Sequence, residues 1–109
     1  MAIALTTHER DALQEAKTEV ASRFPLTWIK LFGSKARGNA DPESDIDVLF
    51  VLDTLNWEAE RSVFEICFHA SLRHDIMLAP LVMSRAETES PLTRATPFFQ
   101  NVEKEGVLL

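Results

Sequence analysis

Residues 45–52 read DIDVLFVL, and this run constrains the fold more than any other part of the chain. After its first three residues the run is apolar, rich in β-branched and aromatic side chains, and too short for a buried helix. A nearly continuous apolar run of this length is typical of a strand buried on both faces. We therefore expect residues 45–52 to form a central strand.

The N-terminal part of the chain predicts a helix in front of this strand. Thr6 is followed three residues later by Glu9, which resembles a capping box. Apolar residues then recur at helical spacing until Pro25 stops the run. The residues that carry this spacing are Leu13, Ala16, Val20 and Phe24.

The remaining segments predict a small α/β (α+β) fold with a mixed sheet flanked by helices. Residues 27–32 (TWIKLF) predict a strand ending at Gly33, and residues 75–82 (DIMLAPLV) predict another, placed at an edge or ended early by Pro80. Between the strands, Asn56 or Thr54 can cap a helix with an apolar stripe, and residues 97–105 predict a last short helix closed by Gly106. The stripe consists of Trp57, Phe64, Cys67, Phe68 and Leu72.

Composition limits the classes of function. The 109 residues suit one domain, residues 1–109, and 46% hydrophobic residues predict a folded core. A net charge of -6 argues against a polymeric nucleic acid as substrate. The longest apolar run, residues 76–83, is too short to span a bilayer, and the start lacks the features of a secretory signal. We expect a cytoplasmic protein with no membrane partner, in which the single cysteine, Cys67, is a buried thiol.

A glycine and a serine mark the end of the first expected strand. Gly33 allows close backbone approach, and Ser34 can cap a short helical turn over residues 34–37. Free N–H groups at such a turn form a seat for phosphate. Lys35 and Arg37 are the nearest cations, and Arg37 can either steady a triphosphate or pin the loop to nearby carboxylates.

Two aspartates follow at the start of the central strand. Asp45 and Asp47 are two residues apart, so their side chains share one face, ~6–7 Å apart along the backbone. Ile46 and Val48 point the other way, into the core. Two carboxylates held together repel each other, which costs stability unless a cation lies between them. Divalent cations remove this repulsion in two-metal sites, which are a standard means of phosphoryl or nucleotidyl transfer. Of the intervening residues, Asp41 and Glu43 are expected in a turn.

The stretch GSKARGNADPESDIDVLFVL resembles the signature of the DNA polymerase beta-like nucleotidyltransferase superfamily: Gly-Ser, ten residues, then Asp-x-Asp. The chain is most similar to the minimal nucleotidyltransferases of that superfamily. This resemblance implies a small α/β enzyme that binds ATP and Mg²⁺, with two ions expected, through Gly33, Ser34, Asp45 and Asp47. The family uses a third carboxylate on a later strand, and Asp75 matches it best. The alternative interpretation is that Asp75 is a solvent-exposed aspartate at the start of a strand.

The resemblance also implies a partner. Many minimal nucleotidyltransferases are antitoxins paired with a HEPN ribonuclease toxin, which some of them inactivate by AMP transfer to a tyrosine. We therefore expect AMP transfer from ATP to a hydroxyl of such a partner. Two alternatives remain: an antitoxin that neutralises its partner by contact alone, and transfer to a small-molecule hydroxyl, which usually needs an additional substrate-binding domain.

Two further groups of residues have no assigned chemistry. The apolar residues near the chain end either complete the core or form a partner surface; they are Phe98, Phe99, Val107, Leu108 and Leu109. The three histidines, His8, His69 and His74, show no metal-ligand spacing, so they are expected on the surface or in packing.

Overall fold

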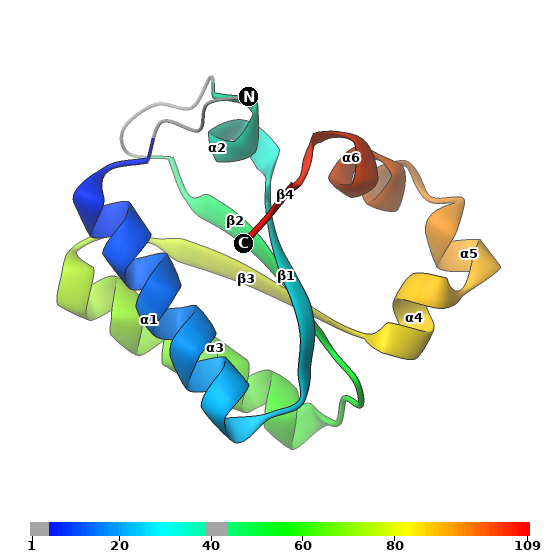
Figure 1. Cartoon of the computed structure of the whole chain (residues 1–109), viewed down its shortest axis with the longest axis horizontal. Helices are drawn as coiled ribbons and strands as arrows, with labels where there is room; N and C mark the ends of the chain where they lie inside the picture. The colour runs from blue at the N-terminus through cyan, green and yellow to red at the C-terminus, as the bar shows by residue number, and fades with distance from the viewer. Residues whose placement is uncertain (1–4, 39–43) are drawn as a thin grey trace.

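The computed structural model describes residues 5–38 and 44–109 and contains a mixed four-stranded sheet of order β3-β2-β1-β4 (Figure 1). β2 (Ile46–Leu52) pairs with β1 (Leu26–Phe32) antiparallel and with β3 (Leu78–Ser84) parallel. The prediction of a central strand is confirmed, and β3 lies at the edge, as Pro80 indicated. Asp41 and Glu43, expected in a turn, lie outside the described residues.

Two long helices cover one face of the sheet. α1 (Thr7–Arg23) begins with the expected capping box, in which Thr6 and Glu9 exchange hydrogen bonds. α3 (Trp57–His74) is capped by the Asn56 side chain, one of the two predicted caps. Both helices pack on the β2 residues that alternate toward them and share one hydrophobic core, and Figure 1 shows the two helices side by side.

The residues of the predicted apolar stripe on α3 do not all face the core. Trp57, Phe64, Phe68 and Leu72 are 42–67% exposed, whereas Cys67 is buried as expected. Burial raises the pKa of the Cys67 thiol to about 12, which leaves it unreactive. The core side of α3 carries smaller side chains because the helix packs closely against α1 and the sheet. These core residues are Ala59, Val63, Ile66, Cys67, Ala70 and Ser71.

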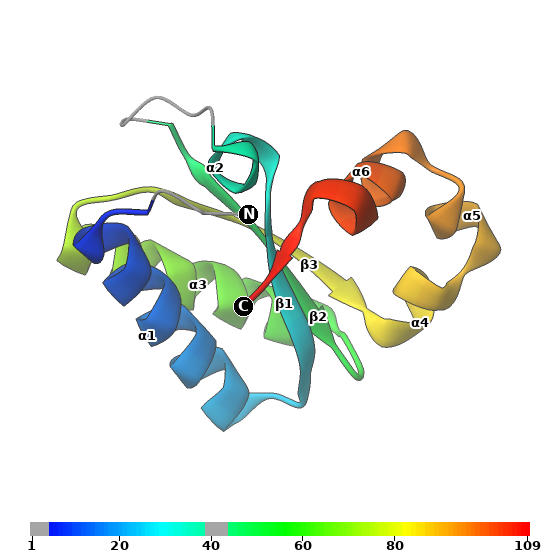
Figure 2. The ribbon, with the colours of Figure 1, turned by 45° about the horizontal axis from the view of Figure 1, so that its top comes forward.

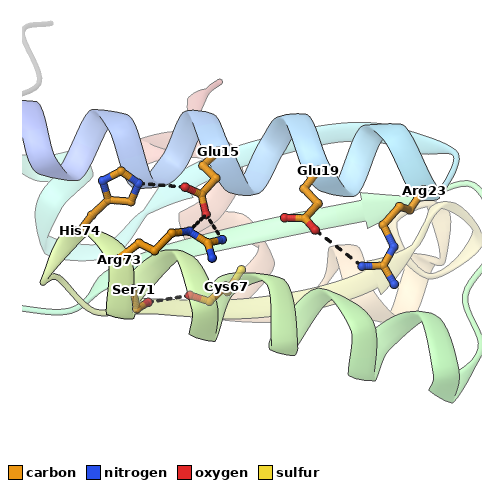
Figure 3. A network of polar contacts seen from close by, with 7 residues as sticks. All are labelled: Glu15, Glu19, Arg23, Cys67, Ser71, Arg73 and His74. Atoms are coloured by element: carbon orange, nitrogen blue, oxygen red, sulfur yellow. Dashed lines mark hydrogen bonds and ion pairs between the residues drawn. The ribbon is translucent and has the colours of Figure 1, made fainter.

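Polar contacts hold the end of α3 against α1 (Figure 3). Glu15 of α1 accepts hydrogen bonds from Arg73, and its second carboxylate oxygen lies 2.9 Å from His74 Nε2. The Arg73 hydrogen bonds lower the pKa of Glu15 against the opposing effect of burial, and His74 adds to this. The last turn of α3 is therefore fixed just before the chain turns toward β3.

The start of the third strand also differs from the expectation. Asp75 ends α3 in a left-handed conformation with a φ of 53°, and β3 begins only at Leu78. The predicted strand over residues 75–82 was therefore placed three residues too early. A hydrogen bond from the Ile46 amide to the Met77 carbonyl, 2.8 Å long, joins the starts of β2 and β3.

The C-terminal helices lie on the opposite face of the sheet (Figure 2). α4 (Arg85–Glu89) and α5 (Pro91–Arg94) were not predicted, whereas α6 (Pro97–Glu105) has its predicted bounds. Phe99 and Val102 of α6 are buried, which supports core completion, but Phe98 is 39% and Leu108 64% exposed. β4 (Val107–Leu108) pairs with β1 and was not predicted. No helix in the described part of the chain is long and apolar enough to cross a membrane.

Candidate active site

Alternation along β2 separates the core from the candidate site. Ile46 and Val48 belong to the core under α1 and α3, as predicted. Leu49 packs on the opposite face, in the cluster that includes Val102 of α6. Because side chains alternate along a strand, Asp47 shares this second face with Leu49. Asp47 is partly buried there, and Asp45 is exposed just before the strand.

Gly33 lies against the Asp47 side chain. Phe32, the last residue of β1, pairs with Asp47 across the sheet, which places the next residue beside the aspartate. Gly33 has a φ of +76°, and a Cβ at this position would overlap the Asp47 carboxylate. The position of the Asp47 side chain thus requires glycine at position 33, a relation that their separation in sequence did not reveal.

The short helix α2 (Gly33–Arg37) begins at this contact. Its N-cap residue is Phe32, with no side-chain cap, so the expectation that Ser34 caps the turn is wrong. Ser34 is partly buried, and its hydroxyl makes no hydrogen bond to any other residue that the structure describes.

Lys35 does not face the expected phosphate seat. Its side chain is 6% exposed, and its Nζ lies 2.7 Å from Oε2 of Glu9, which is also buried. Burial opposes the charge of Glu9, but hydrogen bonds from Lys35 and from the Thr6 amide hold its pKa below the ordinary value. Glu9, the N3 residue of the capping box of α1, thus also anchors α2, a role that the capping-box pattern alone did not show.

The two aspartates and Arg37 interact electrostatically. The pKa of Asp47 is raised, first by burial and then by the negative charge of Asp45, while Arg37 acts in the opposite direction. The clustered negative charge that the sequence predicted is therefore present, and it disfavours the ionised form of Asp47. A cation bound between the carboxylates would reverse this effect.

Arg37 also contacts α6. Its Nη1 lies 3.4 Å from Oε2 of Glu105, and both side chains are more than a third exposed. This ion pair corresponds to the second of the two roles expected for Arg37, in which it pins the loop to a nearby carboxylate. Because exposed ion pairs contribute ~1 kcal/mol or less, the contact leaves Arg37 able to rearrange toward a bound phosphate.

Asp75 is not grouped with the aspartate pair. It caps α3, is exposed, and lies at the same end of the sheet as Asp45 because β2 and β3 run parallel. The β3 residue that pairs with Asp47 is Ala79. Among the described residues, no three His, Cys, Asp or Glu side chains are placed to hold a metal. The role of Asp75 as third carboxylate stays a prediction.

The aspartate pair fits Mg²⁺ in its donor chemistry. Mg²⁺ prefers hard oxygen ligands and is commonly held by one or two carboxylates together with substrate phosphates and water. Asp45 and Asp47 supply two such carboxylates, and their mutual repulsion favours a divalent cation between them. Ser34 and the first amides of α2 lie beside Asp47, where a phosphate bound to the same cation would meet donors.

Comparisons with known proteins indicate the family of the chain. The family model described as a nucleotidyltransferase domain matches residues 13–100, which include the Gly-Ser and Asp-x-Asp residues. Two proteins of Methanocaldococcus jannaschii, both described as candidate protein adenylyltransferases, are each 30% identical to the chain. The matches extend over 100 residues (89% of this chain, 94% of the relative) and 104 residues (94% and 98%). A solved structure of a candidate nucleotidyltransferase from Sulfolobus solfataricus is 24% identical, covers 96% of this chain and 87% of its own, and has a TM-score of 0.48.

Proposed function

The chain belongs to the nucleotidyltransferase domain family, and we propose that it transfers AMP from ATP to a hydroxyl group of a partner protein in a Mg²⁺-dependent reaction. The observation that carries the proposal is the Asp47 carboxylate lying directly over Gly33, with Asp45 close enough to raise its pKa. This contact brings candidate phosphate donors and candidate metal ligands to one point. The two relatives described as protein adenylyltransferases support a protein as the acceptor.

Different residues of the chain would bind the metal and the phosphates. Asp45 and Asp47 would hold Mg²⁺, with Asp75 as the proposed third ligand, and the bound metal would neutralise charge on the triphosphate. The Ser34 hydroxyl and the first amides of α2 donate to phosphate oxygens. Arg37, released from Glu105, adds a charge-assisted contact to the same phosphates.

Transfer forms one phosphorus–oxygen bond and breaks another. The acceptor hydroxyl oxygen bonds to the α-phosphorus of ATP, and the bond from that phosphorus to the oxygen bridging the α- and β-phosphates breaks. Pyrophosphate leaves with that bridging oxygen and the bonding electron pair. The hydroxyl proton passes to a carboxylate oxygen, for which we propose Asp75 at the sheet end shared with Asp45.

The proposed acceptor is a tyrosine of a HEPN-type ribonuclease toxin, which makes the chain an antitoxin. The resemblance of the Gly-Ser and Asp-x-Asp stretch to such antitoxins supports this partner. The net charge of -6 also supports it, because an RNA-binding protein presents a basic surface that is attracted to an acidic one.

Isotope placement tests the proposal. The purified chain and ribonuclease are mixed with Mg²⁺ and ATP labelled at either the α- or the γ-phosphate. We expect the α-label on the ribonuclease, a mass gain of one or more AMP units, and loss of RNase activity, with no transfer of the γ-label. The matched control is the Asp45→Asn, Asp47→Asn double variant, which should transfer nothing.

A contact-only antitoxin is the second candidate, and one observation favours it. Ala79 rather than a carboxylate stands beside Asp47 on β3. If the Asp45→Asn, Asp47→Asn protein silences the ribonuclease as well as the original chain does, with no mass change, contact alone is the mechanism.

The Asp75→Asn variant tests the third carboxylate. Near-complete loss of transfer with nucleotide binding retained supports Asp75 in this role, and an unchanged rate of transfer contradicts it.

A further inference from the structure

The outer face of α3 carries a stripe of large exposed apolar residues that the proposed chemistry does not use. We call this set of residues, Trp57, Phe64, Phe68 and Leu72, the α3 outer stripe; their exposed fractions are 67, 42, 59 and 65%. Their spacing of seven, four and four residues keeps them on one side of the helix. A shallow surface hollow follows the first three of them and is also lined by Glu60, Arg61 and Glu65. Single exposed apolar residues are ordinary, but a group of large ones on one helix face marks an interaction surface.

The area of the stripe indicates what it can bind. From the sizes of these side chains and their exposed fractions, the stripe offers roughly 400–500 Å² of apolar surface. A stable interface of standard size buries ~800 Å² on each partner. The stripe thus supplies about half of an interface, and the flanking side chains must supply the rest.

The flanking charges disfavour a second copy of the chain. Glu60 and Glu65 line the same hollow as the stripe, and Glu58 follows Trp57 in the chain. Among the described residues, Arg61 is the single cation that lines this hollow. Arg61 is already engaged, because its Nε lies 3.1 Å from Glu65 Oε1 and its guanidinium carbon is 5.9 Å from the centre of the Trp57 ring. In a dimer formed through this face, the acidic side chains of the two copies would repel each other. Basic side chains on a different partner would attract them.

We propose that the α3 outer stripe docks a partner protein through an apolar helix or strand of that partner flanked by lysine or arginine. The inference rests on the proposed function in one respect: the partner is the protein whose hydroxyl receives AMP. α3 ends at His74, and shortly after it the carbonyl of Met77 accepts a hydrogen bond from the amide of Ile46 at the start of β2. A partner bound along α3 therefore reaches the sheet end that carries Asp45 and leaves the second face, with Asp47, open to nucleotide.

Charge placed inside the stripe tests the docking. Phe64→Glu with Phe68→Glu changes two exposed side chains, so circular dichroism should show an unchanged fold. The matched control is Leu92→Glu on α5, which is 80% exposed and outside the stripe. With the purified ribonuclease as probe, calorimetry should show affinity about 100-fold weaker for the stripe variant and unchanged for Leu92→Glu, as expected for the loss of central apolar anchors. Transfer by the stripe variant should show a raised KM for the ribonuclease and an unchanged kcat.

The outcomes separate the docking from the chemistry. Unchanged affinity of the stripe variant overturns the docking inference, whether or not AMP is transferred. Stripe-dependent binding without AMP transfer supports the docking and overturns the proposed chemistry. No binding by the original chain overturns both. Sedimentation of the chain alone completes the test, because a dimer that the stripe variant loses would show that a second copy covers α3.

Discussion

At the scale of single residues, Gly33 and Asp47 form a contact that no other residue at position 33 would allow. Gly33→Ala adds a Cβ in a left-handed conformation and directs it into the Asp47 carboxylate. Gly38→Ala is the matched control, because Gly38 has a nearly equal φ of +78° but no described atom within 4 Å of the added Cβ. We expect both variants to lose ~1–2 kcal/mol for the backbone conformation. Gly33→Ala should lose about 1–3 kcal/mol more for overpacking, measured by urea unfolding.

A second substitution identifies the source of that extra loss. In the Asp47→Ala background the carboxylate is absent, so Gly33→Ala should cost little more than Gly38→Ala does. The coupling between positions 33 and 47 is the quantity that a double-mutant cycle measures. Additive effects would show that the Asp47 carboxylate is not what requires glycine at position 33.

The raised pKa of Asp47 predicts how stability changes with pH. A carboxyl whose folded-state pKa lies above its unfolded value of 3.8 binds its proton more tightly when folded, so its stabilising contribution is present below that value. This contribution is lost as pH rises through the folded pKa. Asp47→Asn should therefore unfold like the original chain near pH 3 and be more stable at pH 7 without metal. A gain that shrinks as pH rises would contradict this sign.

At the scale of elements, the buried Glu9–Lys35 pair joins α1 to α2 and so positions Ser34. Glu9→Gln keeps an acceptor for the Thr6 amide but removes the charge beside Lys35. Breaking a buried pair costs about 3–5 kcal/mol. Glu19→Gln is the control, because the Glu19–Arg23 pair is 42–50% exposed and should cost less than about 1 kcal/mol. Urea unfolding measures both, and equal losses would mean that the buried pair does not hold α2.

The elements also show what sequence patterns can and cannot predict. The apolar run of β2, the capping box of α1 and the bounds of α6 follow from local signals, and the structure confirms them. The periodicity of α3 showed that its large side chains share a face but not which face is covered, because small core residues such as Ala59 and Ala70 give a weaker signal. β4 has two residues, too few for any period.

The candidate site divides in the same way. Spacing along a strand was enough to predict that Asp45 and Asp47 interact. It was not enough to predict that Lys35 turns inward to Glu9, or that Asp75 ends a helix instead of starting a strand. Those outcomes depend on how α2 and α3 pack, which is decided by contacts distant in sequence.

At the scale of the whole molecule, ligand binding should appear as global stability, because a ligand that binds only the folded chain shifts its unfolding equilibrium. At a concentration ~100 times the dissociation constant, Mg²⁺ and ATP together should add about 2.7 kcal/mol. For a chain of this size that corresponds to a rise in Tm of roughly 10 °C or more. Mg²⁺ and ATP each alone should give less, since the cation relieves the repulsion between Asp45 and Asp47 and the triphosphate needs that cation to approach them.

The Asp45→Asn, Asp47→Asn variant is the control for this prediction. It should lose the joint shift and melt at an equal or higher temperature without metal, because its carboxylate repulsion is gone. A joint shift of full size in that variant would place the nucleotide at a different site, because both carboxylates that would hold its Mg²⁺ here have been replaced.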